Sequence, residues 1–195
     1  MELYAAVGVY FAFDPVICGG YFEDDSGGHS SNKCYKYIES RWQDFTEMIY
    51  KRHFSSGIVY KDSLHVFGGG DFDTGRILQS TEIISYDGDI RVGTDLPIPL
   101  YFHAMTSVND HVSIITGGET NENSNLDLTW YYDHQNQEFA PGPTLLAGRK
   151  EHAAGTVVDL ETNQKIPVVT GGYNGEVMDS TELLLNGKWQ RGNCA

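Results

Sequence analysis

Short apolar runs that end on a glycine doublet recur four times along the chain. Leu64–Phe67 is one such run, and three others end in the same way. The doublets are Gly19–Gly20, Gly68–Gly69, Gly117–Gly118 and Gly171–Gly172, and their first glycines are 49, 49 and 54 residues apart. An apolar run that stops at glycine is typical of a buried strand entering a turn. A period of this length predicts a repeat architecture.

Each repeat carries the pattern of four short strands. In the second repeat we expect them at Phe54–Tyr60, Leu64–Gly68, Thr81–Tyr86 and Ile90–Gly93. The other repeats show the same order of apolar segments and turn residues, and no segment has a helical period of useful length. Hairpin signals such as Asn186-Gly187 separate the third strand from the fourth. The repeats span approximately residues 1–49, 50–99, 100–146 and 147–195.

This pattern predicts an all-β fold. A four-stranded antiparallel sheet cannot bury both of its faces alone, and radial stacking of such sheets buries them in a β-propeller. We therefore expect one domain over residues 1–195, built from about four blades. Either the four blades close into a ring, or they form part of a larger propeller as an open arc. An open arc would leave two apolar sheet faces exposed.

Polar segments follow the four glycine doublets, and we interpret them as loops: Tyr21–Asn32, Gly70–Gln79, Glu119–Asn125 and Tyr173–Met178. Repeat symmetry would gather them on one rim, where loops can vary while the blades hold them in place. The candidate partner-binding residues in these loops are Asp24, Asp25, Asp71, Asp73, Arg76, Glu119, Glu122, Tyr173 and Glu176.

The charge of the chain restricts its partners. With 27 acidic and 13 basic residues, the formal net charge is −14. Such a surface repels phosphate backbones, which speaks against nucleic acid and favours a basic protein partner. No apolar stretch is long enough for a transmembrane helix. Leu3–Phe13 is apolar but follows no basic residue, so we interpret it as a strand and not as a signal peptide.

Residues around the doublets resemble the kelch repeat. Arg52-His53, His103-Ala104 and Arg149 with His152-Ala153 lie upstream of doublets, and Thr81-Glu82 and Thr181-Glu182 begin third strands. Aromatic residues follow in three fourth strands, at Trp42, Phe139 and Trp189. The resemblance covers essentially the whole chain and implies a kelch-type β-propeller, in which the doublets and these aromatics are structural. Most kelch propellers have more than the four blades counted here.

Enzyme chemistry finds little support. Some kelch-like propellers are enzymes, such as the copper protein galactose oxidase, and His53, His103 and His152 occupy matching positions that could line a metal site. A functional site usually breaks repeat symmetry, so we interpret them as scaffold residues. Carboxylates such as Asp24 and Asp71 could act as acid and base or bind calcium, but solvated loop charges are the simpler interpretation. No phosphate loop or nucleophile motif is present. We expect no enzyme activity, no metal and no cofactor.

The three cysteines are Cys18, Cys34 and Cys194, and no C-x-x-C pair suggests zinc. Cys18 ends the second strand and Cys34 lies in the antiparallel third strand, so a disulfide between them is geometrically plausible. The alternative is two reduced, buried thiols. The pair resembles an arrangement in secreted invertebrate kelch-type proteins, and a disulfide requires an oxidising compartment. We therefore place an extracellular location slightly ahead of a cytoplasmic one.

The sequence thus predicts a non-enzymatic kelch-repeat module that binds a protein through blade-rim loops. An alternative is the substrate-recognition propeller of a cullin-type ubiquitin ligase adaptor, whose BTB domain this chain does not contain. A galactose-oxidase-like or sugar-processing enzyme is a third possibility. The sequence does not indicate the oligomeric state or the partner's identity.

Overall fold

The computed structural model describes residues 3–11 and 13–192. Within these ranges all regular elements are strands, and no helix long and apolar enough to cross a membrane is found among them. The strands are β1 (Val7–Phe11), β2 (Asp14–Cys18), β3 (Tyr21–Asp24), β4 (Gly27–Ser30), β5 (Lys33–Ile38), β6 (Arg41–Glu47), β7 (Ser56–Tyr60), β8 (Ser63–Phe67), β9 (Gly70–Asp71), β10 (Arg76–Ile77), β11 (Thr81–Ser85), β12 (Ile90–Val92), β13 (Ala104–Ser107), β14 (Val112–Thr116), β15 (Thr129–Asp133), β16 (Glu138–Pro141), β17 (Ala153–Val158), β18 (Lys165–Thr170), β19 (Thr181–Leu185) and β20 (Lys188–Arg191).

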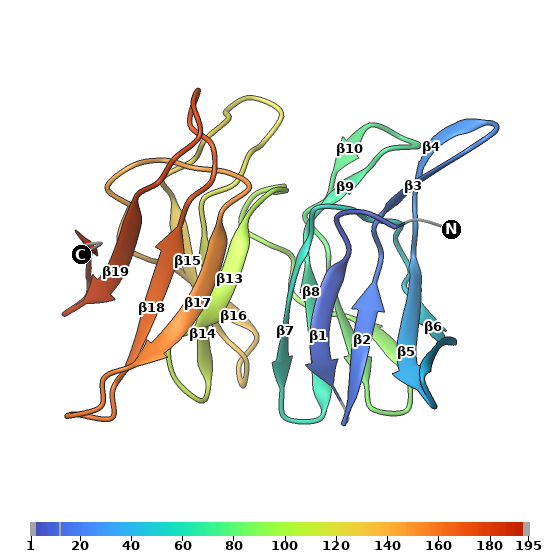
Figure 1. Cartoon of the computed structure of the whole chain (residues 1–195), viewed down its shortest axis with the longest axis horizontal. Coiled ribbons are helices and arrows are strands. Elements are labelled where there is room, and N and C mark those ends of the chain that lie inside the picture. Colours follow the sequence, from blue (N-terminus) through green and yellow to red (C-terminus); the bar gives the residue numbers. More distant parts are fainter. Residues whose placement is uncertain (1–2, 12, 193–195) are drawn as a thin grey trace. The chain divides into compact units, whose positions relative to one another are not determined.

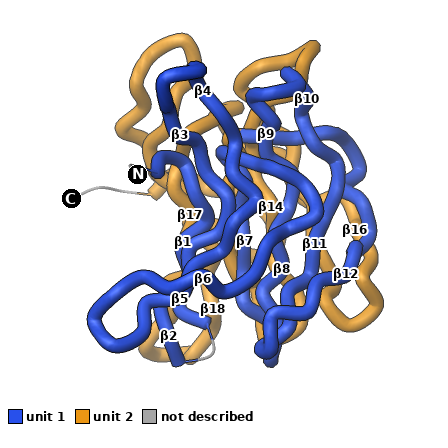
Figure 2. The backbone as a smooth tube through the Cα atoms, turned by 90° about the vertical axis from the view of Figure 1, so that its right-hand side faces the viewer, with its two compact units in different colours: residues 1–101 blue, residues 102–195 orange. Residues whose placement is uncertain are grey.

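The chain divides into two compact units, residues 1–101 and 102–195 (Figure 2). The first unit contains sheet 1 (β1-β2-β5-β6) and sheet 2 (β7-β8-β11-β12). The second contains sheet 3 (β13-β14-β15-β16) and sheet 4 (β17-β18-β19-β20), all of them antiparallel (Figure 1). The predicted all-β fold of four four-stranded sheets is confirmed. The boundary between the units lies close to the end of the second predicted repeat, and the assignment of all 195 residues to one domain stays a prediction.

The strand register aligns the repeats residue by residue. In each sheet, the residue before the glycine doublet pairs with the same position of the third strand: Cys18 with Cys34, Phe67 with Thr81, Thr116 with Thr129 and Thr170 with Thr181. In the same alignment, the fourth strands place Trp42, Ile90, Phe139 and Trp189 at matching positions. The repeat seen in the sequence therefore corresponds to a repeated pattern of strand pairing.

Close approach of neighbouring backbone explains the glycine doublets. Gly19 has φ +68° and Gly20 has φ +109°, and the other three doublets take the same left-handed values. A Cβ atom on Gly19 would lie 2.5 Å from the carbonyl oxygen of Arg52, in the segment that links sheet 1 to sheet 2. Gly20 N donates to that carbonyl at 2.7 Å. The next two doublets make the same contact, from Gly69 N to Leu100 O and from Gly118 N to Arg149 O, so the first three doublets bond each sheet to the segment that follows it.

Two segments that we expected to be loops contain hairpins. β3 and β4 pair within Tyr21–Asn32, and β9 and β10 pair within Gly70–Gln79. Gly27 and Gly75, at φ +122° and +68°, permit the tight turns. The fourth strand of the first repeat is also longer than expected, because a bulge opposite Cys34 and Tyr35 lets β6 continue to Glu47.

Both units bury their cores by the same stacking. We define the forward face of a sheet as the face that carries the residue before its glycine doublet, and the rear face as the opposite one. On the forward face of sheet 1, Val16 and Cys18 belong to one buried cluster with Leu64 and Val66 on the rear face of sheet 2. In the second unit, Ile114 and Tyr131 on the forward face of sheet 3 pack with Val169, Leu184 and Trp189 on the rear face of sheet 4.

Candidate functional site

The rim of the first unit joins the two hairpins through one histidine. His29 of β4 places Nδ1 2.6 Å from Asp73 Oδ1 in the β9–β10 turn, and Nε2 2.8 Å from Ser26 Oγ. Asp24 Oδ1 is 3.4 Å from His29 Nε2. Lys51 Nζ donates to Asp73 Oδ2 at 3.0 Å. Asp24 and Asp73, which the sequence singled out separately, thus meet at His29.

The charges of this cluster support one another. The hydrogen bond to Asp73 raises the pKa of His29 above its usual value, with a further contribution from the charge of Asp24. The pKa of Asp73 is lowered, first by His29 and then by Lys51. Hydrogen bonds from Ser26 lower the pKa of Asp24. Both carboxylates are therefore ionised near neutral pH, and the contact with His29 strengthens when the imidazole is protonated.

A second layer beneath the charges also ties the hairpins together. Phe72 N donates to Ser30 Oγ at 2.8 Å, and the same hydroxyl lies 2.8 Å from His53 Nδ1. The rings of Tyr21 and Phe72 meet edge to face with centroids 5.2 Å apart. The two hairpins therefore contact each other through hydrogen bonds and through packed aromatic rings, and together they form one surface.

The rim of the second unit is organised around Lys150. Its ammonium group is bonded to Glu119, and it lies 5.6 Å from the ring centre of Phe102 and 5.9 Å from that of Tyr173. The backbone of Lys150 also pairs with that of Tyr173. One lysine therefore links the loop at 119–125 with the loop at 173–178, as His29 links the two hairpins of the first unit.

The other predicted rim residues do not enter these clusters. Asp25, Arg76, Glu122 and Glu176 are exposed to solvent. The carboxylate of Asp71 accepts bonds within its own turn, from Asp73 N at 3.1 Å and Thr74 Oγ1 at 2.8 Å.

Our sequence reasoning missed the basic residues of these clusters, Lys51, Lys150 and His29. Lys51 directly precedes Arg52 and Lys150 directly follows Arg149, so a basic neighbour of the repeat arginine was the available signal. His29 carried no repeat signal, since its partner Asp73 lies 44 residues away.

Two of the three repeated histidines, His53 and His152, lie within hydrogen-bond distance of hydroxyl groups. His53, His103 and His152 are all buried. His152 Nε2 lies 2.8 Å from Thr116 Oγ1, as His53 does from Ser30, and burial lowers the pKa of His152 to about 3. Within residues 3–11 and 13–192, no group of three or more His, Cys, Asp or Glu side chains could hold a metal ion.

Buried ion pairs were not anticipated, although their residues belong to the repeat motif. Arg52 Nη2 donates to Glu82 Oε1 at 2.5 Å, and Arg52 Nη1 donates to Gly68 O at 2.6 Å. The Glu82 carboxylate also accepts from Ile49 N at 2.6 Å and Tyr50 N at 3.1 Å. Arg149 and Glu182 repeat this arrangement in the second unit, with Arg149 Nη2 2.6 Å from Glu182 Oε1. Each pair thus bonds the segment that precedes a sheet to the third strand of that sheet.

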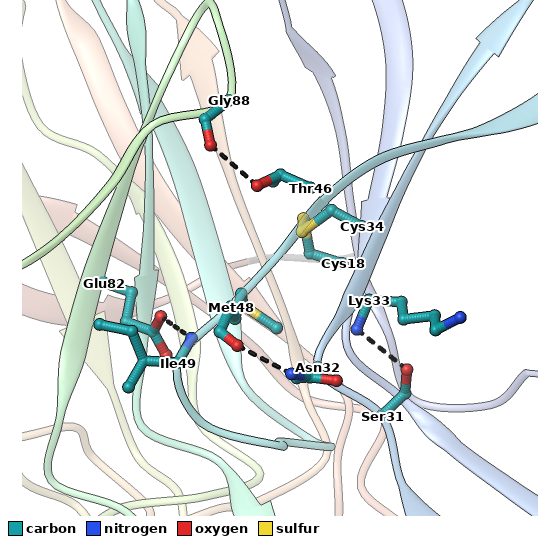
Figure 3. The surroundings of a disulfide bond; sticks show 10 residues. All are labelled: Cys18, Ser31, Asn32, Lys33, Cys34, Thr46, Met48, Ile49, Glu82 and Gly88. Carbon is teal, nitrogen blue, oxygen red and sulfur yellow. Dashed lines mark hydrogen bonds between the residues drawn. A yellow bond between two sulfur atoms is a disulfide. The ribbon is translucent and has the colours of Figure 1, made fainter.

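Cys18 and Cys34 form a disulfide between β2 and β5, and both are buried (Figure 3). Of the two alternatives left open by the sequence, the structure contains the bonded form. Sheet 4 has Thr170 and Thr181 at the same register position, with their hydroxyls 2.9 Å apart. The disulfide lies directly before Gly19 and so holds the base of the β3–β4 hairpin. Cys194 lies outside the described residues.

A cavity of about 820 Å³ opens in the second unit, at the turns β13–β14, β17–β18 and β19–β20. Tyr131 and Leu184 line it, and Lys165 Nζ on its edge is 2.6 Å from Asp110 Oδ1. These turns lie at the opposite end of the strands from the loops that follow the glycine doublets, so none of the predicted site residues lines this cavity.

Comparison with known proteins gives relatives by sequence. No family model matches the chain. Kelch-like protein 41b of Danio rerio is 29% identical over 185 residues, which cover 89% of this chain and 29% of that protein. Kelch-like protein 41a of the same organism is 25% identical over 184 residues, with the same coverage. The chain therefore spans less than a third of the length of these curated relatives.

Comparison with solved structures gives the fold. The structure of YjhT matches with a TM-score of 0.79 over 98% of this chain and 71% of that chain, at 13% sequence identity. At that identity the likeness speaks for the fold alone. The chain is similar in sequence to Kelch-like proteins, and its four four-stranded sheets have the fold of a kelch-type β-propeller of about four blades.

Proposed function

We propose that this chain is a non-enzymatic protein-interaction module that binds its partner through the rim hairpins β3–β4 and β9–β10. The observation that carries the proposal is the contact of His29 with Asp73 at 2.6 Å, which joins the hairpins into one surface. Ordered loops lose less conformational entropy on binding, which favours their use as recognition elements. Likeness to Kelch-like proteins supports a module of this kind.

The partner surface is basic. Acidic side chains dominate the two hairpins, with Lys51 and Arg76 as nearby cations, and the chain as a whole carries a formal net charge of −14. The hairpin carboxylates are Glu23, Asp24, Asp25, Asp71 and Asp73. Complementary charge speeds association and excludes acidic competitors, nucleic acid among them. In the second unit, Glu122, Tyr173 and Glu176 are proposed as further contacts.

A comparative capture experiment tests this proposal. The chain with Asp24→Asn and Asp25→Asn loses two exposed rim charges, whereas the control with Asp62→Asn and Asp87→Asn loses two exposed charges from the turns β7–β8 and β11–β12 at the other end of the sheet. Proteins captured by the unmodified chain and by the control, but released by the rim variant, should have basic surfaces and should elute with rising salt. A captured set that is the same for all three proteins would contradict the proposal.

The absence of enzyme activity is part of the proposal. The sequence allows a third possibility, a galactose-oxidase-like or sugar-processing enzyme with a central metal or sugar site, and the galactose-oxidase-like form predicts a bound metal. Metal analysis of the purified chain distinguishes the two, because a stoichiometric metal ion would favour the enzyme.

A second candidate function is substrate recognition for a cullin-type ubiquitin ligase. The matched region makes up 29% of the Kelch-like relatives, so the observation that favours this candidate is likeness to part of longer proteins. The buried disulfide favours an oxidising compartment and therefore an extracellular protein. Counting thiols in unfolded protein from its natural source separates the two: one free thiol among the three cysteines supports the extracellular module, and three support the ligase adaptor.

A further inference from the structure

The cavity of the second unit lies apart from the proposed rim site. It opens at the turns β13–β14, β17–β18 and β19–β20 and has a volume of about 820 Å³. All of its lining residues belong to the second unit, so its walls come from sheets 3 and 4 and their turns alone. Ligand pockets in proteins commonly have volumes of about 300–1,000 Å³, and this cavity is therefore large enough to hold a ligand.

The floor of the cavity is apolar. Val108 and Tyr131 line it from the side of sheet 3, and Pro167 and Leu184 line it from the side of sheet 4. Pro167 and Leu184 are buried, whereas Val108 and Tyr131 are half-buried and pack against the core cluster that contains Leu184. The core therefore holds the floor in place before any ligand arrives. Such a floor suits an aliphatic side chain, which gains by leaving water.

One polar group lies among these apolar side chains. Among the described residues, the hydroxyl of Tyr131 has no hydrogen-bond partner, and burial raises the pKa of Tyr131 above its usual value. The phenol is therefore neutral near pH 7 and can donate a hydrogen bond. A ligand that brings a carbonyl oxygen to this hydroxyl would gain that bond.

Amide side chains surround the mouth of the cavity. Asn163 and Gln164 belong to the turn β17–β18 and Asn186 to the turn β19–β20, and all three are exposed. Their side-chain amides make no hydrogen bond within the part of the chain that the structure describes. A side-chain amide both donates and accepts, as a backbone peptide unit does, so the two can pair through two hydrogen bonds.

The charges at the mouth compensate each other. Lys165 Nζ lies 2.6 Å from Asp110 Oδ1, so neither group requires an ion of opposite charge in the cavity. The lining thus fits a neutral ligand that combines an aliphatic group with amide bonds. A saccharide fits it less well, because its hydroxyl groups would lose their water against the aliphatic floor.

We propose that this cavity binds a neutral peptide segment of another protein. One aliphatic side chain of the segment lies on the floor, and its backbone bonds to the amides of Gln164 and Asn186 and to the hydroxyl of Tyr131. The site is at the opposite end of the strands from the rim loops, so it goes beyond the proposed rim site and does not depend on it. The variant with Asp24→Asn and Asp25→Asn should therefore bind such a peptide as well as the unmodified chain does.

An NMR titration of the isotope-labelled full chain tests the proposal. The probe is a blocked tripeptide with leucine between two alanines, and the control peptide has serine in place of leucine. The leucine peptide should shift the signals of Tyr131, Gln164 and Leu184. The serine peptide should bind at least about tenfold more weakly, because it buries no aliphatic side chain.

Two variants locate the peptide in the cavity. Gln164→Ala removes one amide and Tyr131→Phe removes only a hydroxyl, and each should weaken binding of the leucine peptide about threefold or more, as for lost hydrogen bonds. Gln135→Ala is the matched control, since Gln135 is an exposed glutamine in the turn β15–β16 that does not line the cavity. Circular dichroism checks that each variant folds.

Three results would overturn the proposal: no shift of the lining residues up to the solubility limit of the leucine peptide, equal binding of the leucine and serine peptides, or equal affinities for Gln164→Ala and Gln135→Ala. A titration with N-acetylglucosamine adds a fourth. If this saccharide shifted the lining residues at lower concentration than the leucine peptide, the cavity would be a saccharide site and the peptide proposal would be wrong.

Discussion

Arg52 and Glu82 form an ion pair in which neither side chain is exposed to solvent. Arg52 is contributed by the segment between sheets 1 and 2, and Glu82 by β11 of sheet 2. Burial lowers the pKa of Arg52, and the charge of Glu82 acts against that change. The pair exists in a dry environment only because each charge compensates the other, which makes it sensitive to loss of either partner.

Replacement of one partner should destabilise the protein strongly. Arg52→Leu leaves Glu82 buried without its cation, and we expect the free energy of unfolding to fall by about 3–5 kcal/mol. Arg149→Leu should cause a similar loss, since Arg149 bonds to Glu182 and to the equivalent backbone carbonyls of sheet 4. Urea denaturation followed by circular dichroism measures the change. Arg41→Leu is the control, because Arg41 meets Glu39 on the surface at 3.8 Å, and equal losses for Arg41 and Arg52 would contradict the expectation.

Loss of the disulfide should also lower stability. The bond joins residues 16 apart, and closing a loop of that length contributes about 3 kcal/mol in the chain-entropy model. The double variant Cys18→Thr, Cys34→Thr copies the threonine pair of sheet 4, so it keeps the strand register while it removes the crosslink. We expect a lower melting temperature in calorimetry. A reducing agent should lower the melting temperature of the unmodified chain but leave that of the variant unchanged, and the opposite pattern would argue against a structural disulfide.

Acid should weaken the protein through His152. Its pKa is lowered to about 3 by burial, whereas an unfolded histidine titrates near 6.5. Below pH 6.5 the unfolded chain therefore binds a proton at this histidine, whereas the folded protein does so only near pH 3. As the pH is lowered through this window, the free energy of unfolding should decrease by up to about 1.4 kcal/mol per pH unit. Unfolding measured between pH 7 and pH 4 should show a shallower slope for His152→Gln. The variant His111→Gln, at an exposed turn position, should keep the original slope.

The rim cluster should respond to pH in the opposite direction. Because the pKa of His29 is raised, its contact with Asp73 is fully present below pH 6.5 and weakens as the pH rises through the raised value. An NMR titration of the imidazole should show this pKa, and Asp73→Asn should lower it. Asp25→Asn removes an exposed charge from the same hairpin and should change it less. If both variants had the same effect, the direct contact would be refuted.

Local patterns in the chain determined the strands and their order. Gly-Gly doublets, hairpin turns and short apolar runs act over a few residues, and their spacing placed all four sheets correctly. The same patterns missed the hairpins β3–β4 and β9–β10. These short strands are polar and contain glycine. The contact of His29 with Asp73 helps to hold them together, and no local sequence pattern predicts that contact.

The sequence did not show which side chains of the repeat motif bond to each other. Arg52 and Glu82 were visible as members of a motif, but their pairing depends on the path of the segment between two sheets. Cys18 and Cys34 could be bonded or reduced until the register set them directly opposite each other.

The clearest division between sequence and structure is at the two tryptophans. Arg41-Trp42-Gln43 and Lys188-Trp189-Gln190 have nearly the same local sequence, and both form the expected fourth strand. Strand formation follows from neighbours along the chain, so the sequence by itself determined it. Burial depends on whether another sheet packs on that face, which only the tertiary structure decides: sheet 3 covers Trp189, and Trp42 remains 47% exposed.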